Sequence, residues 1–121
     1  MAAKKRILIC DDEEGVRESL KLILEDDYDL SFATTGNEAI EKTKKEPIDL
    51  VILDIKMPKM NGLETLKELK KVSPGIKAII ASGYKSVEVA SEVTKLGASD
   101  YIIKPFDTSQ VLNIINNILN Q

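Results

Sequence analysis

An alternation between two kinds of segment, repeated five times along the chain, most constrains what this sequence can fold into. One kind is a run of four to six residues rich in Ile, Leu and Val, as expected for a buried β-strand. The other is longer and repeats its apolar residues at helical spacing, for example at Val16, Leu20 and Ile23. Strands that alternate with helices predict a parallel sheet with helices on both faces.

The bounds of the predicted elements follow from this alternation and from local start and stop signals. Thr35, Asn61 and Asp107 are placed to cap helices, whereas Pro47 and Gly97 are placed to end them. We predict strands at residues 6–10, 30–33, 49–53, 76–81 and 100–103. We predict helices at residues 14–25, 36–45, 62–71, 86–96 and 108–119. The predicted fold class is therefore α/β, with a doubly wound five-stranded parallel sheet.

The length and composition fit one globular domain. A chain of 121 residues can bury a single core, and no linker or internal repeat divides it, so we expect one domain over residues 1–121.

The net charge of −3 argues against a nucleic-acid-binding surface. The single cysteine precludes an intrachain disulfide and fits a reducing compartment. Without histidine, a metal would be held by oxygen ligands, which favours Mg²⁺.

The beginning of the chain resembles a secretion signal only superficially. Basic residues at positions 4–6 precede an apolar run of four residues, which stops before Asp11 and is too short for a signal peptide. No segment approaches the length of a membrane span. We therefore expect a cytoplasmic protein that does not contact a membrane.

Polar residues follow the predicted strands at the point where each strand ends. Asp11-Asp12-Glu13-Glu14 follow the first strand, Asp54 ends the third, Ser82-Gly83 follow the fourth and Lys104-Pro105 follow the fifth. In open parallel sheets the carboxyl ends of the strands share one edge, and ligands bind there. Three aspartates, a hydroxyl and a lysine should therefore meet at one site.

The charges at this edge predict metal-assisted phosphoryl chemistry. Clustered carboxylates repel one another, so they either hold raised pKa values or bind a cation. A divalent cation and Lys104 would together neutralise the oxygens of a phosphoryl group, and the Ser82 hydroxyl could donate a hydrogen bond to one of them. Asp54 is then the natural nucleophile, because carboxylates form acyl phosphates.

Over nearly its whole length, the chain resembles the receiver domain of two-component response regulators, as used in chemotaxis and phosphorelays. From Asp54, Ser82 is 28 positions further on and Lys104 is 50, and both spacings match the family. The resemblance rests on Asp11-Asp12, Asp54 within LDIKMPKMNG, Ser82-Gly83, Tyr101 and Lys104-Pro105-Phe106. It implies a flavodoxin-like (βα)5 fold with strand order 2-1-3-4-5 and a cis peptide bond between Lys104 and Pro105.

The resemblance also implies a role for each matching residue. Asp54 would accept a phosphoryl group from a phosphohistidine, and Lys104 would bind the phosphoryl oxygens. Asp12, Asp54 and the backbone carbonyl of Lys56 would bind Mg²⁺, with Asp11 acting through water and Mn²⁺ as an alternative ion. Such a domain promotes its own phosphorylation and dephosphorylation without being a turnover enzyme.

Two further residues carry the switch that the resemblance implies. Ser82 would turn toward the phosphoryl group, and Tyr101 would turn inward behind it. These movements would alter the surface formed by the fourth helix, fifth strand and fifth helix. Members of the family often pair through that surface when phosphorylated, so a phosphorylation-dependent homodimer is a second expectation.

Residues around the site are expected to tune its reactions. In the family, the positions of Lys56 and Tyr84 control how fast water reaches the acyl phosphate, and their bulk here predicts slow hydrolysis. The partner would be a histidine kinase or a histidine phosphotransfer protein. The residues expected to dock it are Gly15, Val16, Ser19, Pro105 and Phe106.

Several alternatives remain open at this point. A phosphohydrolase of the aspartyl-phosphate type would carry a second Asp where Lys56 stands, and a flavin-binding module would need a Ser/Thr/Gly-rich loop after the first strand. The chain could be a free-standing regulator or the N-terminal receiver of a longer one. The fourth helix, with apolar Val87, Val89, Val93 and Leu96, is either well buried or a partner-binding face.

Overall fold

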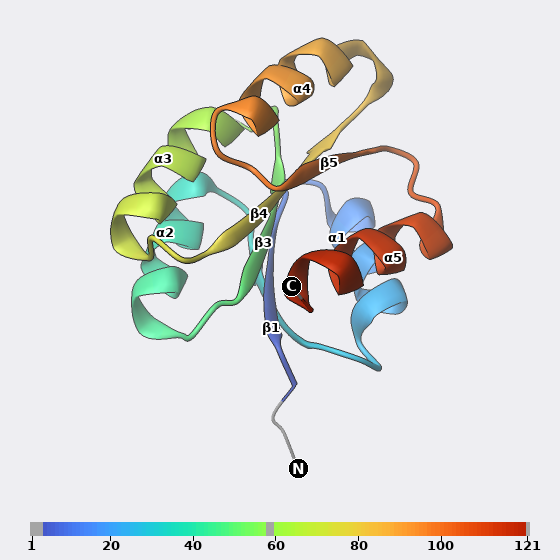
Figure 1. Ribbon diagram of the computed structural model, residues 1–121, viewed down its shortest axis with the longest axis horizontal. Helices are drawn as coiled ribbons and strands as arrows, with labels where there is room; N and C mark the ends of the chain where they lie inside the picture. Colours follow the sequence, from blue (N-terminus) through green and yellow to red (C-terminus); the bar gives the residue numbers. More distant parts are fainter. Residues whose placement is uncertain (1–3, 58–59, 121) are drawn as a thin grey trace.

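A computed structural model describes residues 4–57 and 60–120 of the chain. Strands and helices alternate along these residues, as the sequence predicts (Figure 1). The strands are β1 (Arg6–Cys10), β2 (Asp29–Ala33), β3 (Leu50–Asp54), β4 (Lys77–Ser82) and β5 (Asp100–Ile103). The helices are α1 (Glu14–Leu24), α2 (Gly36–Lys45), α3 (Gly62–Val72), α4 (Val87–Lys95) and α5 (Thr108–Leu119). Pro58, part of the LDIKMPKMNG motif, lies outside the described residues.

The strands form one parallel sheet with the order β2-β1-β3-β4-β5. This confirms both the predicted doubly wound class and the strand order that the family resemblance implied. Strand β3 lies at the centre of the sheet, and all five of its residues are buried. The order reverses between β1 and β3, so the ends of these two strands border the switch point where ligands bind in such folds.

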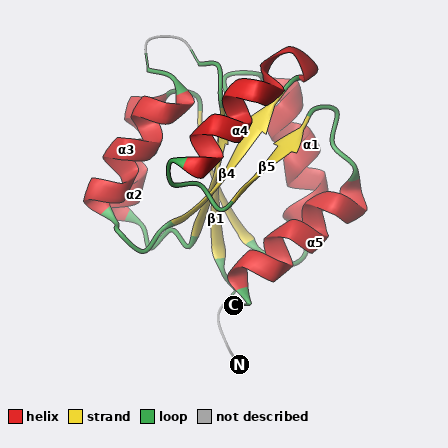
Figure 2. Cartoon of the chain, turned by 45° about the horizontal axis from the view of Figure 1, so that its top comes forward, coloured by secondary structure: helices red, strands yellow, loops and turns green. Residues whose placement is uncertain are grey.

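Two layers of helices enclose the sheet (Figures 1 and 2). Helices α1 and α5 cover one face, and α2, α3 and α4 cover the other. Along β1, Ile7 and Ile9 pack beneath α1 and α5, whereas Leu8 and Cys10 pack beneath the other three helices. This alternation follows from the two-residue period of a strand, and it gives the molecule two separate apolar cores.

The helix caps agree with the sequence in most places. The Thr35 and Asp107 side chains accept from the backbone N–H three residues on, and Asn61 forms a full capping box with Glu64. Gly97 adopts a φ of 151°, which a residue with a side chain rarely takes, and it ends α4 as predicted.

The fourth helix differs from the prediction at its start. Residues 84–86 form a 3-10 turn, so α4 begins at Val87 rather than at residue 86. Ala90 and Val93 are buried, but Val89 and Leu96 are 52% and 68% exposed. The helix is therefore only half buried and keeps apolar side chains on its outer face. In the described part of the chain, every helix falls short of the length and apolar character that a membrane span requires.

Candidate functional site

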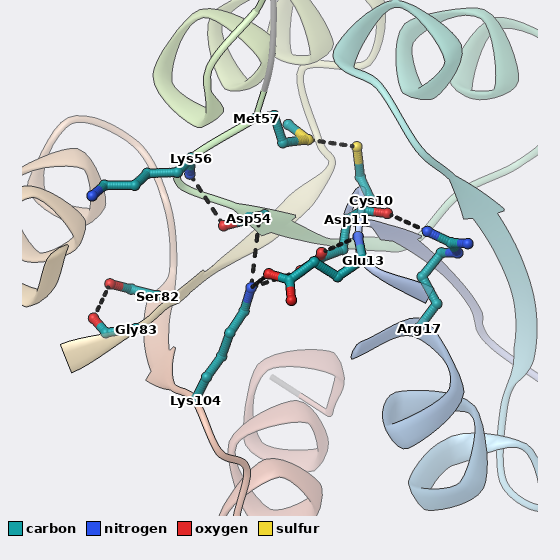
Figure 3. Close-up of polar contacts among 10 residues, drawn as sticks. All are labelled: Cys10, Asp11, Glu13, Arg17, Asp54, Lys56, Met57, Ser82, Gly83 and Lys104. Atoms are coloured by element: carbon teal, nitrogen blue, oxygen red, sulfur yellow. Dashed lines mark hydrogen bonds and ion pairs between the residues drawn. The ribbon is translucent and has the colours of Figure 1, made fainter. Parts of the chain in front are cut away.

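The predicted site residues meet at the carboxyl edge of the sheet (Figure 3). The Lys104 ammonium lies 2.9 Å from Asp11 Oδ2, 3.5 Å from Asp54 Oδ2 and 3.9 Å from Glu13 Oε1. The residues come from three elements: the loop after β1, the end of β3 and the loop after β5. The peptide bond that follows Lys104 is cis, as the resemblance implied.

Strand alternation explains why these side chains converge. Ile9, Ile52 and Ile102 all pack beneath α1 and α5, and two residues beyond each of them stand Asp11, Asp54 and Lys104. Residues two apart on a strand share a face, so the same geometry that buries the isoleucines aims the two carboxylates and the ammonium at one point.

Ser82 belongs to the same sheet edge but to the opposite face. Its neighbour two residues back, Ile80, packs in the core beneath α2, α3 and α4. The Ser82 hydroxyl is buried and donates to the Gly83 carbonyl at 2.8 Å, turned away from the acidic cluster (Figure 3). Tyr101 packs against that same core and pairs with Ile80 in the β4–β5 register. The two predicted switch residues therefore lie together, on the α4 side of the sheet.

Burial decides the protonation behaviour of Asp54, which is only 5% exposed. Loss of hydration raises its pKa above the ordinary value, and the Asp11 charge raises it further. The Lys56 backbone N–H, which donates to Asp54 Oδ1 at 3.1 Å, and the Lys104 ammonium both act in the opposite direction. The net rise means that the Asp54 carboxylate is insufficiently stabilised by the protein alone.

For Lys104, the neighbouring carboxylates outweigh burial in setting the pKa. Burial alone would lower its pKa, but the hydrogen bond to Asp11 and the charges of Asp11, Asp54 and Glu13 raise it above the ordinary value. Lys104 is therefore a permanent cation at neutral pH. It provides one positive charge against several carboxylates.

The carboxylates can gather around a cation. Asp11, Asp12, Glu13 and Asp54 each offer an oxygen, and these oxygens lie within 4.8 Å of one another. An all-oxygen set at the edge of a partly open cavity suits a hard divalent cation that keeps some of its water. Glu13 was not among the ligands predicted from the sequence, although its place in the Asp-Asp-Glu-Glu run was the available signal.

Local hydrogen bonds hold the acidic loop in place. The Glu13 backbone N–H donates to Asp11 Oδ1 at 2.9 Å, and the Arg17 guanidinium donates to the Asp11 carbonyl at 2.9 Å. Arg17 reaches back from α1 to make this contact (Figure 3). The loop is thereby tied to the helix that follows it.

A cavity of about 370 Å³ gives access to Asp54. Its walls include Glu13, Lys56, Gly83 and Lys104, and the Lys56 side chain is exposed and extends away from Asp54 (Figure 3). The structure does not describe the Tyr84 side chain, so its predicted role in hydrolysis stays a prediction.

The residues predicted to dock a partner also lie together. They line a groove of about 660 Å³ between α1 and the loop from β5 to α5, which we call the α1–α5 groove. Leu22, which is 75% exposed, and Ile23 extend it, and sequence reasoning missed both. The full set of predicted residues in its walls is Gly15, Val16, Ser19, Pro105 and Phe106.

Comparison with known proteins agrees with this geometry. The sequence model of the response regulator receiver domain matches residues 7–116. The chain belongs to the response regulator receiver domain family. Receiver domains are phosphoacceptor switches of two-component signal transduction, and response regulators partner with histidine kinases or phosphotransfer proteins.

Similar receiver domains occur both alone and within longer proteins. The chain is 40% identical over 116 residues to the chemotaxis protein CheY of Thermotoga maritima, covering 94% of this chain and 97% of that one. It is 40% identical over 102 residues to the transcriptional regulatory protein ZraR of Escherichia coli K12, covering 84% of this chain but 23% of ZraR. A CheY-like receiver structure from Methanospirillum hungatei aligns with a TM-score of 0.88 at 38% identity, over 98% of this chain and 95% of that chain.

Proposed function

We propose that Asp54 is the phosphoacceptor of this receiver domain and that its phosphorylation requires Mg²⁺. The observation that carries this proposal is the convergence of a buried carboxylate of raised pKa, a lysine and further carboxylates on one cavity. Asp11, Asp12, Asp54 and the Lys56 carbonyl would hold the ion, with Glu13 in reach. The bound ion supplies positive charge for the phosphoryl oxygens and lowers the repulsion among the carboxylates.

The chain's own residues account for the transfer step. An Asp54 carboxylate oxygen attacks the phosphorus of a phosphohistidine in line, and a new O–P bond forms as the P–N bond breaks. The leaving imidazole nitrogen takes the bonding electron pair. Lys104 is close enough to turn from Asp11 to the phosphoryl oxygens, and its raised pKa keeps it charged while it does so.

Ser82 and Tyr101 form the proposed switch. The Ser82 hydroxyl gives up its bond to the Gly83 carbonyl and donates to a phosphoryl oxygen instead. Tyr101, half buried beside Ile80, then turns inward behind it. Because α4 packs on this side of the sheet, the change alters the surface formed by α4, β5 and α5.

The proposed phosphodonor is a histidine kinase or phosphotransfer protein that docks in the α1–α5 groove. The groove supports this because it is lined by apolar side chains and shares Glu13 and Lys104 with the wall of the phosphoacceptor cavity. We propose a single receiver domain over residues 1–121, serving as a free-standing regulator or as the receiver of a longer protein.

Intact mass spectrometry tests the proposal. The protein is incubated with acetyl phosphate, with and without Mg²⁺, alongside Asp54→Ala. We expect one added phosphoryl group in the unaltered chain only, and only with Mg²⁺. An adduct on Asp54→Ala would place the phosphoacceptor elsewhere, and no adduct under any condition would contradict phosphorylation altogether.

A further inference from the structure

Glu13 stands at the border between the docking groove and the phosphoacceptor cavity. Only Glu13 and Lys104, among the residues that the structure describes, line both spaces. The groove and the cavity therefore adjoin at these two side chains, on the side from which a partner in the α1–α5 groove would approach Asp54. The same carboxylate also borders the entrance that a small phosphodonor would use.

The Glu13 carboxylate is not required by the fold. Glu13 occupies the N-cap position of α1, yet among the described residues its side chain makes no capping hydrogen bond. Its side chain is 67% exposed, and its ion pair with Lys104 is long, at 3.9 Å. By contrast, Asp11 and Asp54 are buried and bonded to other groups. Asp12 is exposed as well, but among the described residues it lines neither the groove nor the cavity, so Glu13 is the exposed carboxylate of the cluster that borders both spaces.

We propose that Glu13 is a specificity-determining residue that disfavours small anionic phosphodonors relative to a protein donor seated in the α1–α5 groove. The inference rests on the proposed function, because it concerns delivery of the phosphoryl group to Asp54. Glu13 would act on donor selection at the entrance, whereas Asp54 and Lys104 contact the phosphoryl group itself.

The charge balance at the site supports this assignment. Four carboxylates gather around the Lys104 ammonium, and the exposed Lys56 and Lys85 also line the cavity, so Glu13 is a local negative charge at a border that otherwise carries lysines. A small phosphodonor that carries two negative charges is repelled by the Glu13 carboxylate as it enters this cavity, and a donor with less charge is repelled less. A protein donor gains binding energy from remote contacts in the groove, and this energy offsets the same repulsion.

The test compares Glu13→Gln with Glu14→Gln. Both variants remove one charge, but Glu14, also described by the structure, is exposed and lies outside both cavity walls. Initial phosphorylation rates are measured at saturating Mg²⁺ with two donors: acetyl phosphate, a dianion near neutral pH, and phosphoramidate, which carries less net charge. With acetyl phosphate, the Asp54 O–P bond forms as acetate leaves with the electron pair. With phosphoramidate, ammonia leaves.

We expect Glu13→Gln to accelerate phosphorylation by acetyl phosphate about fivefold at low ionic strength and by phosphoramidate about twofold, because repulsion scales with donor charge. The gain should shrink in 1 M salt, where the Debye length is about 3 Å. Glu14→Gln should leave both rates unchanged. A second measurement, independent of phosphorylation, is the Kd for Mg²⁺ from thermal-shift titration, which should rise about threefold for Glu13→Gln alone.

Two results would overturn the assignment. Equal rates for the two variants, or a Glu13→Gln gain that is the same for both donors and insensitive to salt, would exclude charge-based selection. An unchanged Mg²⁺ affinity would show that the Glu13 carboxylate does not face the cluster. Loss of phosphorylation in the unaltered chain would be a different failure, because it removes the proposed function as well.

Discussion

The Lys104 ammonium lies closer to Asp11 than to Asp54, at 2.9 Å from Asp11 Oδ2 and 3.5 Å from Asp54 Oδ2. The lysine thus holds together the carboxylates of two neighbouring strand ends, in addition to its proposed role with the phosphoryl group. Lys104→Met should lower the free energy of unfolding by about 1–3 kcal/mol, because buried Asp11 and Asp54 lose their cation. Urea unfolding measures this, with Lys95→Met at an exposed α4 position as the control. An equal loss of unfolding free energy in the two variants would contradict this stabilising role of Lys104.

The raised pKa of Asp54 predicts a pH-dependent stability. The folded state binds the Asp54 proton more tightly than the unfolded chain, where the ordinary value is 3.8. The poorly hydrated Asp54 charge therefore reduces stability as pH rises from 3.8 through the raised pKa, and the loss is complete above it. Asp54→Asn removes this charge, so we expect a higher urea midpoint at pH 7 without Mg²⁺.

That difference in urea midpoint should disappear below pH 3.8, where Asp54 is protonated in both states. The exposed Asp26→Asn variant provides the matched control. A difference that stays constant across the pH range would show that amide packing, rather than charge, causes the stabilisation.

Mg²⁺ should raise the melting temperature, because it binds the folded acidic cluster and not the unfolded chain. At a hundredfold excess over the Kd, the stabilisation should be ~2.7 kcal/mol. Asp12→Ala removes one oxygen ligand of the cluster, so Mg²⁺ should raise the melting temperature of this variant less. An identical Mg²⁺ response in the unaltered chain and in Asp12→Ala would exclude Asp12 as a ligand.

The α1–α5 groove predicts a donor-specific defect. Leu22→Asp should slow transfer from a phosphohistidine protein about tenfold, because a carboxylate would be buried in an apolar contact. Phosphorylation by acetyl phosphate should stay within twofold, because Leu22 lies outside the phosphoacceptor cavity wall among the described residues. Leu96→Asp, at an exposed leucine after α4, is the control. Equal slowing of protein transfer by both variants would place docking elsewhere.

The lifetime of the acyl phosphate tests Lys56 and Tyr84 together. We predict that a Lys56→Asn, Tyr84→Ala variant loses its phosphoryl group faster than the unaltered chain, since smaller side chains would let water reach Asp54. Decay of the phosphorylated mass after removal of the donor measures both rates. An equal or longer lifetime in the variant would refute the tuning role of these positions.

The alternation of apolar residues predicts the strand–helix order and the meeting of Asp11, Asp54 and Lys104, because both depend on regular backbone periods. It does not reveal that Glu13 joins them. That outcome depends on the local turn in which the Glu13 N–H bonds to Asp11. Nor does it give the orientation of the Ser82 hydroxyl, because a rotatable O–H turns toward its nearest acceptor, here the Gly83 carbonyl.

Leu22 was missed for a related reason. Its place on α1 is readable from the helical period, but its contribution to a groove depends on where the distant loop carrying Pro105 and Phe106 passes. Contacts between segments far apart in sequence are set by tertiary packing. The neighbouring docking residues were therefore predicted from the resemblance to a family, and the local sequence pattern did not identify them.

The two-residue period of the strands also places the phosphorylation site and the switch residues on opposite faces of the sheet. Asp54 and Lys104 follow isoleucines that pack beneath α1 and α5, whereas Ser82 and Tyr101 belong to the face covered by α4. In the proposed switch, the signal therefore crosses the sheet at its carboxyl edge, by rotation of the Ser82 side chain about one torsion. A residue with no hydroxyl at position 82 would still permit phosphorylation of Asp54, but the change at the site would no longer reach the face covered by α4.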